Sequence, residues 1–453
     1  MRDLLFIVVL GCVMLALTDL DLGIRDALDP LEPSTPSSMP DDLKQQLEEF
    51  NTIAREVDRT VREARERGNA LTGLLALRAI AEARLGQNPM VDQAIATMLM
   101  QAEAELGNEQ EALAAADIAA PIRPVESKCA APADGWRPCN AVEAIESLAN
   151  DQRVVMINEA HHVPRHRAVT IELLRALRDE GFTHFAAETL YDTDDELNER
   201  GFPTTDSGAY LAEPMYASLI REALQLGYIV VPYEASHAGL GGRERGQAEN
   251  LKKRVFDRDP DARLLVHAGY AHINESGTVA GARTMAQELA EMLDVDPLTI
   301  DQTVMSQRSA PPFEHPIYRD VADRFDLAQP TVFLNENDEP WTLHSEVRDV
   351  TLFLPRSMVE DGRPSWLTSL EGRMAVAVKD HEIEETDDVS GLILVRAFRA
   401  DEMAKPGAIP VDQYVAPAGK PLPPLVLTDG DYVVIVEDAE GRRVAEWSIE
   451  ARE

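Results

Sequence analysis

Four short apolar segments of the chain each end in side chains that can take up or release protons. The segments are 154–158, 183–188, 228–235 and 263–273. The ionisable residues at their ends are Glu159, His161, His162, Glu188, Glu234 and His272. Because buried strands consist mostly of apolar residues, ionisable groups repeated at these places indicate a functional site.

A histidine beside a carboxylate is suited to general-base catalysis on water, because the carboxylate fixes which ring nitrogen carries the proton. The same groups could instead hold a divalent metal ion and lower the pKa of its bound water. In either case Glu159 would orient the base, Glu188 would position water or metal, and His272 would act as electrophile or second ligand. Either His161 or His162 could be the base.

Basic residues accompany these carboxylates. Pro164 stands where a helix after the first segment would begin, and that helix would aim its backbone N–H groups at the site. Arg165 and His166 follow directly, and Arg243 follows the third segment. We expect these residues to hold an anionic part of a substrate or a developing oxyanion, with Glu234 as a further substrate contact.

Other common chemistries lack their motifs in this chain. It has no Gly-x-Ser-x-Gly elbow, no cysteine near the ionisable groups, and no glycine-rich nucleotide loop after the first segment. With 43 Lys and Arg against 80 Asp and Glu, the formal net charge is −37. Such a surface repels phosphate backbones, so the expected substrate is a small molecule or a peptide and not a nucleic acid.

Helical spacing of apolar residues separates these segments and predicts the scaffold that positions the site. The expected helices lie near 165–180, 209–226, 243–256 and 281–293. Apolar strands alternating with helices are typical of an α/β fold whose parallel sheet is covered on both faces. Residues 297–304 are expected to add a strand, and His267, inside the fourth segment, is expected to be a satisfied core histidine. Ligands of such sheets bind at the carboxyl ends of the strands.

Regions of different character flank this α/β domain, which we expect to span residues 141–310. Residues 41–117 have apolar residues at helical spacing and resemble tetratricopeptide-type helical pairs, which could recruit a protein partner. Residues 118–140 form a proline-rich connection. Residues 311–453 carry strand patterns and turns, and predict a β-rich module without a chemical motif.

The N-terminus resembles an export signal. Residues 1–17 contain one apolar run, in which Val-Leu-Gly-Cys places Cys12 where bacterial lipoproteins carry their lipid. Residues 18–40 are acidic and rich in proline and serine, which suits a tether. We therefore expect an exported protein of the cell envelope, tethered to a membrane and facing the periplasm. In that oxidising compartment Cys129 and Cys139 would form a disulfide.

Four short motifs occur in order along the α/β region. They are Asn-Glu-Ala-His at 158–161, Phe-Ala-Ala-Glu at 185–188, Arg-Glu-Arg-Gly-Gln-Ala-Glu-Asn at 243–250 and Ala-Gly-Tyr-Ala-His-Ile at 268–273. Together they resemble the superfamily of the haem-binding uptake (ChaN-like) proteins, the erythromycin esterase-like hydrolases and the Tiki/TraB metalloprotease-like proteins. The superfamily motifs have glycine where this chain has Asn158, and the esterase-like form has histidine where it has Gly269.

The residues and this resemblance together leave three functions open. The first is an exported, lipid-anchored hydrolase that uses the His/Glu site to activate water on an ester or peptide bond. The second, which the ChaN-like resemblance implies, is a non-catalytic lipoprotein that binds haem or a metal ion. The third is a scaffold whose helical and β-rich regions recruit partners and whose site is inactive. The ChaN-like form of the first motif selects His161 as the working histidine, whereas the esterase-like form selects His162.

Overall fold

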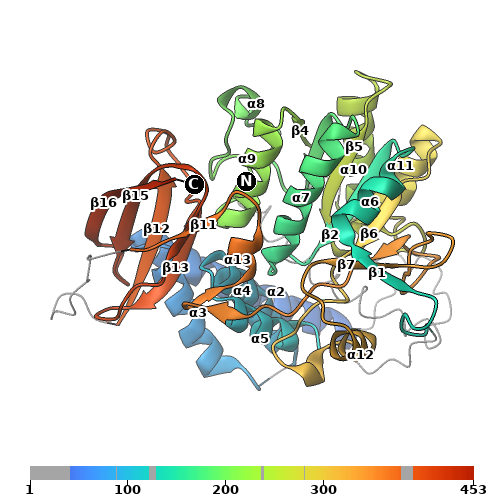
Figure 1. Cartoon of the computed structure of the whole chain (residues 1–453). Coiled ribbons are helices and arrows are strands. Elements are labelled where there is room, and N and C mark those ends of the chain that lie inside the picture. Colours follow the sequence, from blue (N-terminus) through green and yellow to red (C-terminus); the bar gives the residue numbers. More distant parts are fainter. Residues whose placement is uncertain are drawn as a thin grey trace. The chain divides into compact units, whose positions relative to one another are not determined.

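The computed structural model describes residues 41–87, 89–121, 129–235, 239–279, 281–378 and 391–452. These residues form two compact units (Figure 1). The described residues between 122 and 357 make the first, the α/β unit, and those before 122 and after 357 make the second, the helix–strand unit. The α/β unit therefore reaches Ser357, beyond the boundary expected at 310, and the N-terminal helices share a unit with the C-terminal strands.

A parallel sheet of six strands lies at the centre of the described part of the α/β unit, which confirms the expected fold class. Its strands are β2 (Val154–Glu159), β3 (His184–Ala187), β4 (Ile229–Pro232), β5 (Leu264–Gly269), β6 (Leu298–Asp301) and β8 (Val350–Thr351). Their order is β4-β3-β5-β2-β6-β8, and all neighbours are parallel. The three strands β3, β5 and β2 are thus adjacent, and their carboxyl ends lie along one edge.

The fourth predicted strand is shorter than expected. β5 ends at Gly269, and Tyr270–Ile273 form a 3-10 turn, η5. Tyr270 has a φ of 43°, which lies in the left-handed region that extended strands do not use. The prediction of a strand over 263–273 is therefore wrong beyond Gly269, because this turn interrupts an otherwise apolar run.

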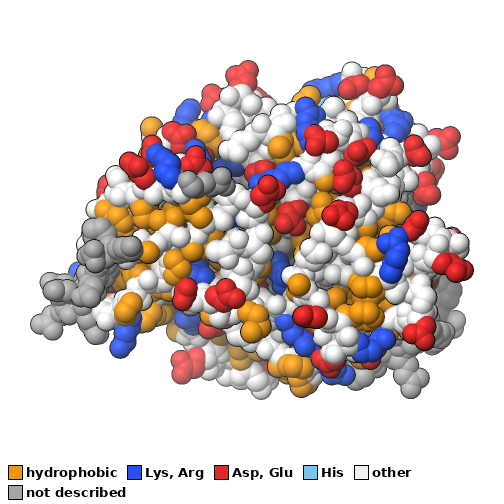
Figure 2. Space-filling model, viewed as in Figure 1, with side chains coloured by type: hydrophobic (Ala, Val, Ile, Leu, Met, Phe, Trp, Pro, Cys, Tyr) orange, Lys and Arg blue, Asp and Glu red, His pale blue; other side chains and the backbone are white. Residues whose placement is uncertain are grey.

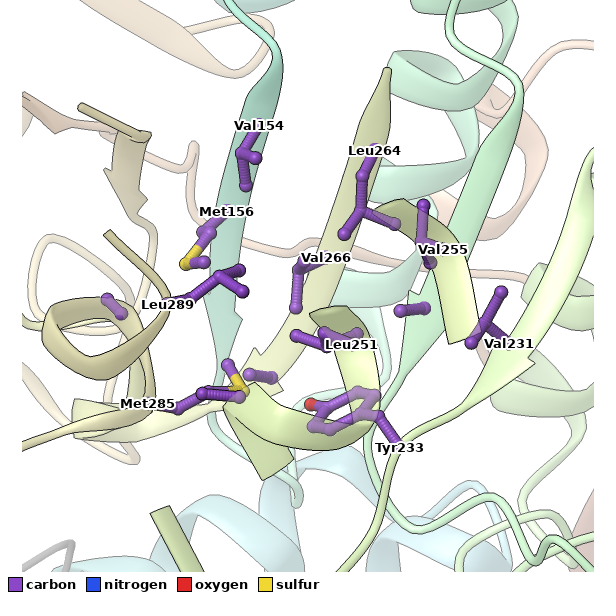
Figure 3. Packing of buried hydrophobic residues seen from close by; sticks show 14 of the residues in the cluster. Val154, Met156, Val231, Tyr233, Leu251, Val255, Leu264, Val266, Met285 and Leu289 are labelled. Carbon is purple, nitrogen blue, oxygen red and sulfur yellow. The ribbon is translucent and has the colours of Figure 1, made fainter. Parts of the chain in front are cut away.

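Alternation along the strands divides their side chains between two faces. On one face, Val154, Met156, Leu264 and Val266 pack with Leu251 and Leu289 (Figure 3). The helices of this layer are α10 (Gly239–Leu251), the π-helical turn η4 (Lys252–Phe256) and α11 (Met285–Leu293). The other face carries α6 (Ala141–Ala149), α7 (Arg165–Asp179) and α9 (Pro214–Gln225), which contact one another in sequence order. Both faces are covered, as the sequence predicts.

Outside the main sheet, the α/β unit has one antiparallel pair among its described residues, formed by β1 (Arg137–Asn140) and β7 (Thr331–Leu334). The unit also contains α8 (Leu197–Arg200), η6 (Pro311–Phe313) and α12 (Pro316–Arg324). Cys139 lies on β1 opposite Val332 of β7, and the Cys129 sulfur lies 3.6 Å from the carbonyl oxygen of Thr342. Both cysteines are free thiols. The expected disulfide is not formed in the structure, and it stays a prediction.

The helix–strand unit combines the N-terminal helices with an antiparallel sheet. The N-terminal helices are α2 (Asp41–Arg67), α3 (Ala70–Arg84), α4 (Pro89–Glu105) and α5 (Glu109–Ala119), and one short helix, α13 (Trp366–Ser369), comes from the C-terminal part of the chain. The main sheet has the order β13 (Asp412–Pro417), β12 (Leu392–Arg399), β15 (Gly430–Glu437), β16 (Arg443–Ala451). Two short antiparallel pairs accompany it, β9 (Val359–Glu360) with β10 (Arg363–Pro364) and β11 (Met374–Val376) with β14 (Leu425–Leu427). Leu71, Leu74 and Leu106 of the helical part form one buried cluster with Leu394 of β12, so distant parts of the chain share one core.

The expected signal segment 1–17, the linker 18–40 and Cys12 lie outside the described residues. Among the residues that are described, no helix is both long and apolar enough to cross a membrane. The face in Figure 2 carries acidic side chains interspersed with basic ones.

Candidate functional site

The edge formed by β2, β5 and β3 brings together a continuous chain of ionisable side chains. Glu159 Oε1 lies 2.6 Å from His161 Nδ1, and His161 Nε2 lies 4.0 Å from Glu188 Oε2. Glu188 Oε1 in turn lies 3.3 Å from His272 Nε2. Residues that the sequence places on separate segments therefore meet in one cluster, as expected from the parallel sheet.

Glu159 is the fixed end of this chain. Arg167, in the first turn of α7, donates to both carboxylate oxygens, from Nε at 2.7 Å and from Nη2 at 2.9 Å. His267 Nε2 lies 2.9 Å from Oε2. Burial alone would raise the pKa of Glu159, but Arg167 and His267 hold it well below its usual value. Glu159 is therefore an ionised carboxylate that can only accept hydrogen bonds.

The ring of His161 is oriented on all sides. Because Glu159 is ionised and can only accept, His161 Nδ1 carries a proton in this contact, and in the neutral ring the lone pair would be on Nε2. The ring centroid lies 4.5 Å from that of Tyr210 and 5.2 Å from that of Tyr270, the latter nearly perpendicular. A Cβ atom at Gly269 would lie 2.5 Å from His161 Nε2, so glycine is required there for the imidazole to fit.

Glu188 faces His161 from the end of β3. Its Oε1 accepts from Arg243 Nη2 at 2.6 Å, and its Oε2 accepts from the backbone N–H of Gly269. Arg243 also donates to both oxygens of Glu234, from Nε at 2.9 Å and from Nη2 at 2.7 Å. The two glutamates at the ends of β3 and β4 thus share one buried guanidinium.

His272 completes the chain on the side of β5. Its Nδ1 lies 2.7 Å from Glu244 Oε1, and its Nε2 lies 2.9 Å from Arg243 Nη1. Burial alone would lower the pKa of His272, but Glu244 and Glu188 raise it to about 10. The raised pKa favours an imidazolium, whose Nε2–H would face Glu188, because Arg243 Nη1 can only donate and offers that nitrogen no acceptor. A protonated His272 would be suited to stabilise developing negative charge.

Two of the predicted residues, His162 on the loop after β2 and His166 on α7, do not belong to this row of contacting ionisable side chains. Burial lowers the pKa of His162 well below its usual value, and His162 Nδ1 has no hydrogen-bond partner among the described residues. His166 Nδ1 accepts from the backbone N–H of Ala160 at 3.0 Å, and burial lowers the pKa of His166 to about 3. Both are neutral at pH 7. The geometry therefore favours His161 over His162 as the oriented histidine.

The predicted anion contacts are engaged within the protein. Arg165 donates from Nη1 to the backbone carbonyl of Pro355. Arg243 is bound by Glu188 and Glu234. Arg243 thus binds carboxylates of the site, and Arg165 holds the segment after β8.

Sequence reasoning assigns no role to several residues of the cluster. It does not single out Arg167, two residues after Arg165, although Arg167 anchors Glu159. His267 is a core histidine as expected, and it also binds Glu159. Glu244, next to the predicted Arg243, pairs with His272. The signal for Arg167 is its position in the first turn of α7, from which it can reach back to the end of β2.

Unusual backbone conformations follow the ends of β3 and β5. Thr189 has a φ of 65° directly after Glu188, and Tyr270 has a φ of 43° directly after Gly269. Such conformations cost a non-glycine residue about 1–3 kcal/mol and persist only where the surroundings impose them. They mark the two turns that set the positions of Glu188 and His272.

The donor set does not fit a metal ion. The oxygens of Glu159 and Glu188 are taken up by Arg167 and Arg243, and a divalent cation among them would stand beside two guanidinium groups. In the described part of the chain, no group of three or more His, Cys, Asp or Glu residues is arranged to hold a metal ion. The arrangement instead suits proton transfer between an oriented imidazole and a buried carboxylate.

No protein-family model and no curated protein matches the chain. Among solved structures, the type III effector HopBA1 is 17% identical, with 39% of this chain and 91% of that chain covered and a TM-score of 0.26. A structure of bacterial protein toxins is 14% identical, with 63% and 73% covered and a TM-score of 0.28. RRSP, a MARTX toxin effector domain from Vibrio vulnificus, is 15% identical, with 63% and 70% covered and a TM-score of 0.26. At such TM-scores these likenesses carry no argument about function.

Proposed function

We propose that the chain is a hydrolase in which His161 takes a proton from water, and the resulting hydroxide attacks an ester or peptide carbonyl. One observation carries this proposal: Glu159 contacts His161 Nδ1 at 2.6 Å, while a Glu188 carboxylate oxygen lies 4.0 Å from His161 Nε2 on the other side of the ring. A carboxylate on Nδ1 keeps Nε2 basic and stabilises the imidazolium formed when the proton arrives. His161 then returns the proton to the leaving alcohol or amine.

Glu188 would place the water. Its Oε2 lies 4.0 Å from His161 Nε2, so a molecule hydrogen bonded to one of these atoms also lies beside the other. The Gly269 N–H holds this oxygen in place. Glu188 would therefore position the nucleophile, which is also the role proposed for it from the sequence.

His272 would stabilise the oxyanion of the tetrahedral intermediate. Glu244 and Glu188 raise the pKa of His272, which favours the protonated ring near neutral pH, and burial would strengthen its interaction with an oxyanion because the local dielectric is low. Arg243 donates to Glu188 Oε1, and its Nη1 lies 2.9 Å from His272 Nε2, so the guanidinium stands beside both groups. The proposal for His272 is thus electrophilic assistance and not metal ligation.

The alternative proposal, a lipoprotein that binds haem or a metal ion, has less support. Its metal-ion form is disfavoured because Arg167 and Arg243 occupy the oxygens of Glu159 and Glu188. The burial of His161, His162 and His272 limits the access of haem and of a hydrolase substrate alike. The hydrolase would work in the cell envelope if the export and lipid-anchor expectations for residues 1–40 hold. A haem titration of the purified protein distinguishes the two proposals, because a saturable Soret shift would support the binding lipoprotein.

Separate substitution of the two neighbouring histidines tests the hydrolase. The purified full-length protein, His161→Ala and His162→Ala are assayed on a panel of nitrophenyl esters and fluorogenic peptides at about pH 7.5. His161→Ala should lower kcat by at least about 100-fold, and His162→Ala, which replaces an equally buried neighbour, should change it by less than about 5-fold.

Circular dichroism verifies that both variants are folded. If both keep the activity of the unsubstituted protein, the hydrolase proposal is wrong. If His162→Ala alone is inactive, the base is His162 and the role given to Glu159 fails.

A further inference from the structure

The carbonyl of Tyr270 is held by two side chains that come from other elements. Tyr270 begins the turn η5 with a φ of 43°. Its carbonyl oxygen accepts from Asn158 Nδ2 at 3.0 Å and from Arg348 Nη2 at 3.4 Å. Asn158 is on β2, and Arg348 lies just before β8. Two donors on one buried carbonyl oppose the cost of the left-handed conformation and select it.

The same two side chains belong to a buried polar frame around the turn. Asn158 Nδ2 also donates to Asp301 Oδ1 at 3.0 Å, and Arg348 Nη1 lies 3.0 Å from Asp301 Oδ2. Arg348 Nε donates to Asn274 Oδ1 at 2.8 Å. These side chains therefore bind the turn at both ends, at the Tyr270 carbonyl and at the Asn274 side chain. Asp301, at the end of β6, binds both Asn158 and Arg348.

The gripped turn carries two groups that touch the proposed chemistry. The ring of Tyr270 packs on His161, with centroids 5.2 Å apart and planes at 88°. His272, two residues further, lies 3.3 Å from Glu188. A rotation of the turn would move both the Tyr270 ring, which packs on His161, and the imidazole of His272, which lies beside Glu188. The contacts of Arg348 named above lead to the turn or to Asp301, whereas Asn158 also accepts from the backbone N–H of Gln302 at 2.9 Å and directly precedes Glu159. Arg348 therefore gives the cleaner test of the turn.

We propose that Asn158 and Arg348 are positioning residues that lock the Tyr270 carbonyl and thereby set where Tyr270 meets His161 and where His272 meets Glu188. The proposal rests on the hydrolase proposed above for its catalytic consequence, but its geometric content stands on its own. The proposal gives a role to Asn158. At this position the superfamily that the chain resembles has glycine in its first motif.

Two substitutions and a matched control test it. Asn158→Ala removes one donor to the Tyr270 carbonyl. Arg348→Lys keeps a positive charge for Asp301 but loses the planar fork that reaches both ends of the turn. Thr303→Val is the control, because the Thr303 hydroxyl also donates to Asp301 Oδ1, at 2.7 Å, and belongs to the segment after β6 and not to the turn.

Two readouts are measured on the full-length proteins: the kinetics of hydrolysis, and the pKa of the His272 ring by NMR titration. Asn158→Ala and Arg348→Lys should lower kcat by about 10–100-fold with KM changed by less than about 3-fold, since misplacement by about 1 Å has effects of this size. They should also lower the pKa of the His272 ring relative to the unsubstituted protein, because the turn places the ring beside Glu244 and Glu188, which raise it. Thr303→Val should leave kcat and the pKa unchanged.

The proposal is overturned if both variants behave like Thr303→Val in kcat and in the His272 titration. If the unsubstituted protein hydrolyses nothing on the panel, the proposed function fails, and the titration alone decides the positioning role. If Asn158→Ala does not fold, Arg348→Lys decides, because it preserves the charge balance with Asp301.

Discussion

Substituting Arg167 by methionine would remove the cation that two buried carboxylates share. Arg167 Nε lies 2.7 Å from Glu159, and Nη1 lies 2.5 Å from Glu213, the residue that caps α9. Removing one partner of a buried ion pair costs about 3–5 kcal/mol, because the other charge is left without compensation. Glu213 keeps the two backbone N–H groups of its helix cap, so most of this cost should come from Glu159.

The assay is urea denaturation at pH 7, followed by far-UV circular dichroism and supported by thermal melting. For a unit of this size, a loss of about 3–5 kcal/mol lowers the melting temperature by roughly 6–20 °C. Arg175→Met is the matched control. Arg175 lies on the same helix and pairs with Glu222 of α9 at 2.6 Å, but it is 27% exposed. Its loss should cost at most about 1 kcal/mol.

A double variant identifies the cause of the loss. Glu159→Gln combined with Arg167→Met removes the stranded charge, so it should be more stable than Arg167→Met alone by about 1–3 kcal/mol. The reasoning is refuted if Arg167→Met shifts the urea midpoint no further than Arg175→Met. It is also refuted if the double variant is no more stable than the single one, since the damage would then come from lost packing.

Two further predictions concern the turn at the end of β5 and the pH dependence of stability. Gly269→Ala would place a Cβ atom 2.5 Å from His161 Nε2 and 2.8 Å from Glu188 Oε2. The substitution should therefore lower turnover by at least about 100-fold while the protein stays folded. Turnover within about 5-fold of that of the unsubstituted protein would contradict the site geometry. Burial and the neighbouring Asp349 raise the pKa of Glu275 from 4.5 to about 8. The folded protein then keeps a proton that the unfolded chain releases, so this contribution to stability is fully present below pH 4.5 and is lost as the pH rises through 8. The melting temperature should fall as the pH rises from about 4.5 to about 8, and an equal fall in Glu275→Gln would exclude this carboxyl as the cause.

The sequence predicts the sheet well because its signal is local. Apolar runs of strand length between helical stretches identify β2 and β3 to within a residue or two, and place Glu159 and Glu188 at their ends. The turn η5 escapes this reasoning, because Tyr270 is apolar in pattern and tyrosine does not favour the left-handed region. Its conformation is imposed by Asn158 and Arg348, and Arg348 is 78 residues away in the chain.

The division into units escapes it for a related reason. Helices before residue 122 share a core with strands after 357, and no periodicity within either stretch records which partner it meets. The sequence therefore shows that both regions exist but not that they pack together.

Within the site, the sequence identifies the ionisable groups at strand ends but not their pairing. The position of His267 inside a buried strand fits ordinary core contacts as well as a contact with Glu159, so the pattern alone does not reveal the pair. The choice between His161 and His162 likewise depends on which ring the turn after β2 aims at Glu159, which only the three-dimensional structure determines.

The tautomer of His161 tests the central claim most directly. Ionised Glu159 should hold the proton of the neutral ring on Nδ1 and leave Nε2 as the proton acceptor. Long-range ¹H–¹⁵N NMR correlation of the histidine rings at about pH 7.5, with His161→Ala used for assignment, distinguishes the two tautomers. A protonated Nδ1 and an unprotonated Nε2 are predicted, whereas a neutral His161 that carries its proton on Nε2 would contradict the role of His161 as the base.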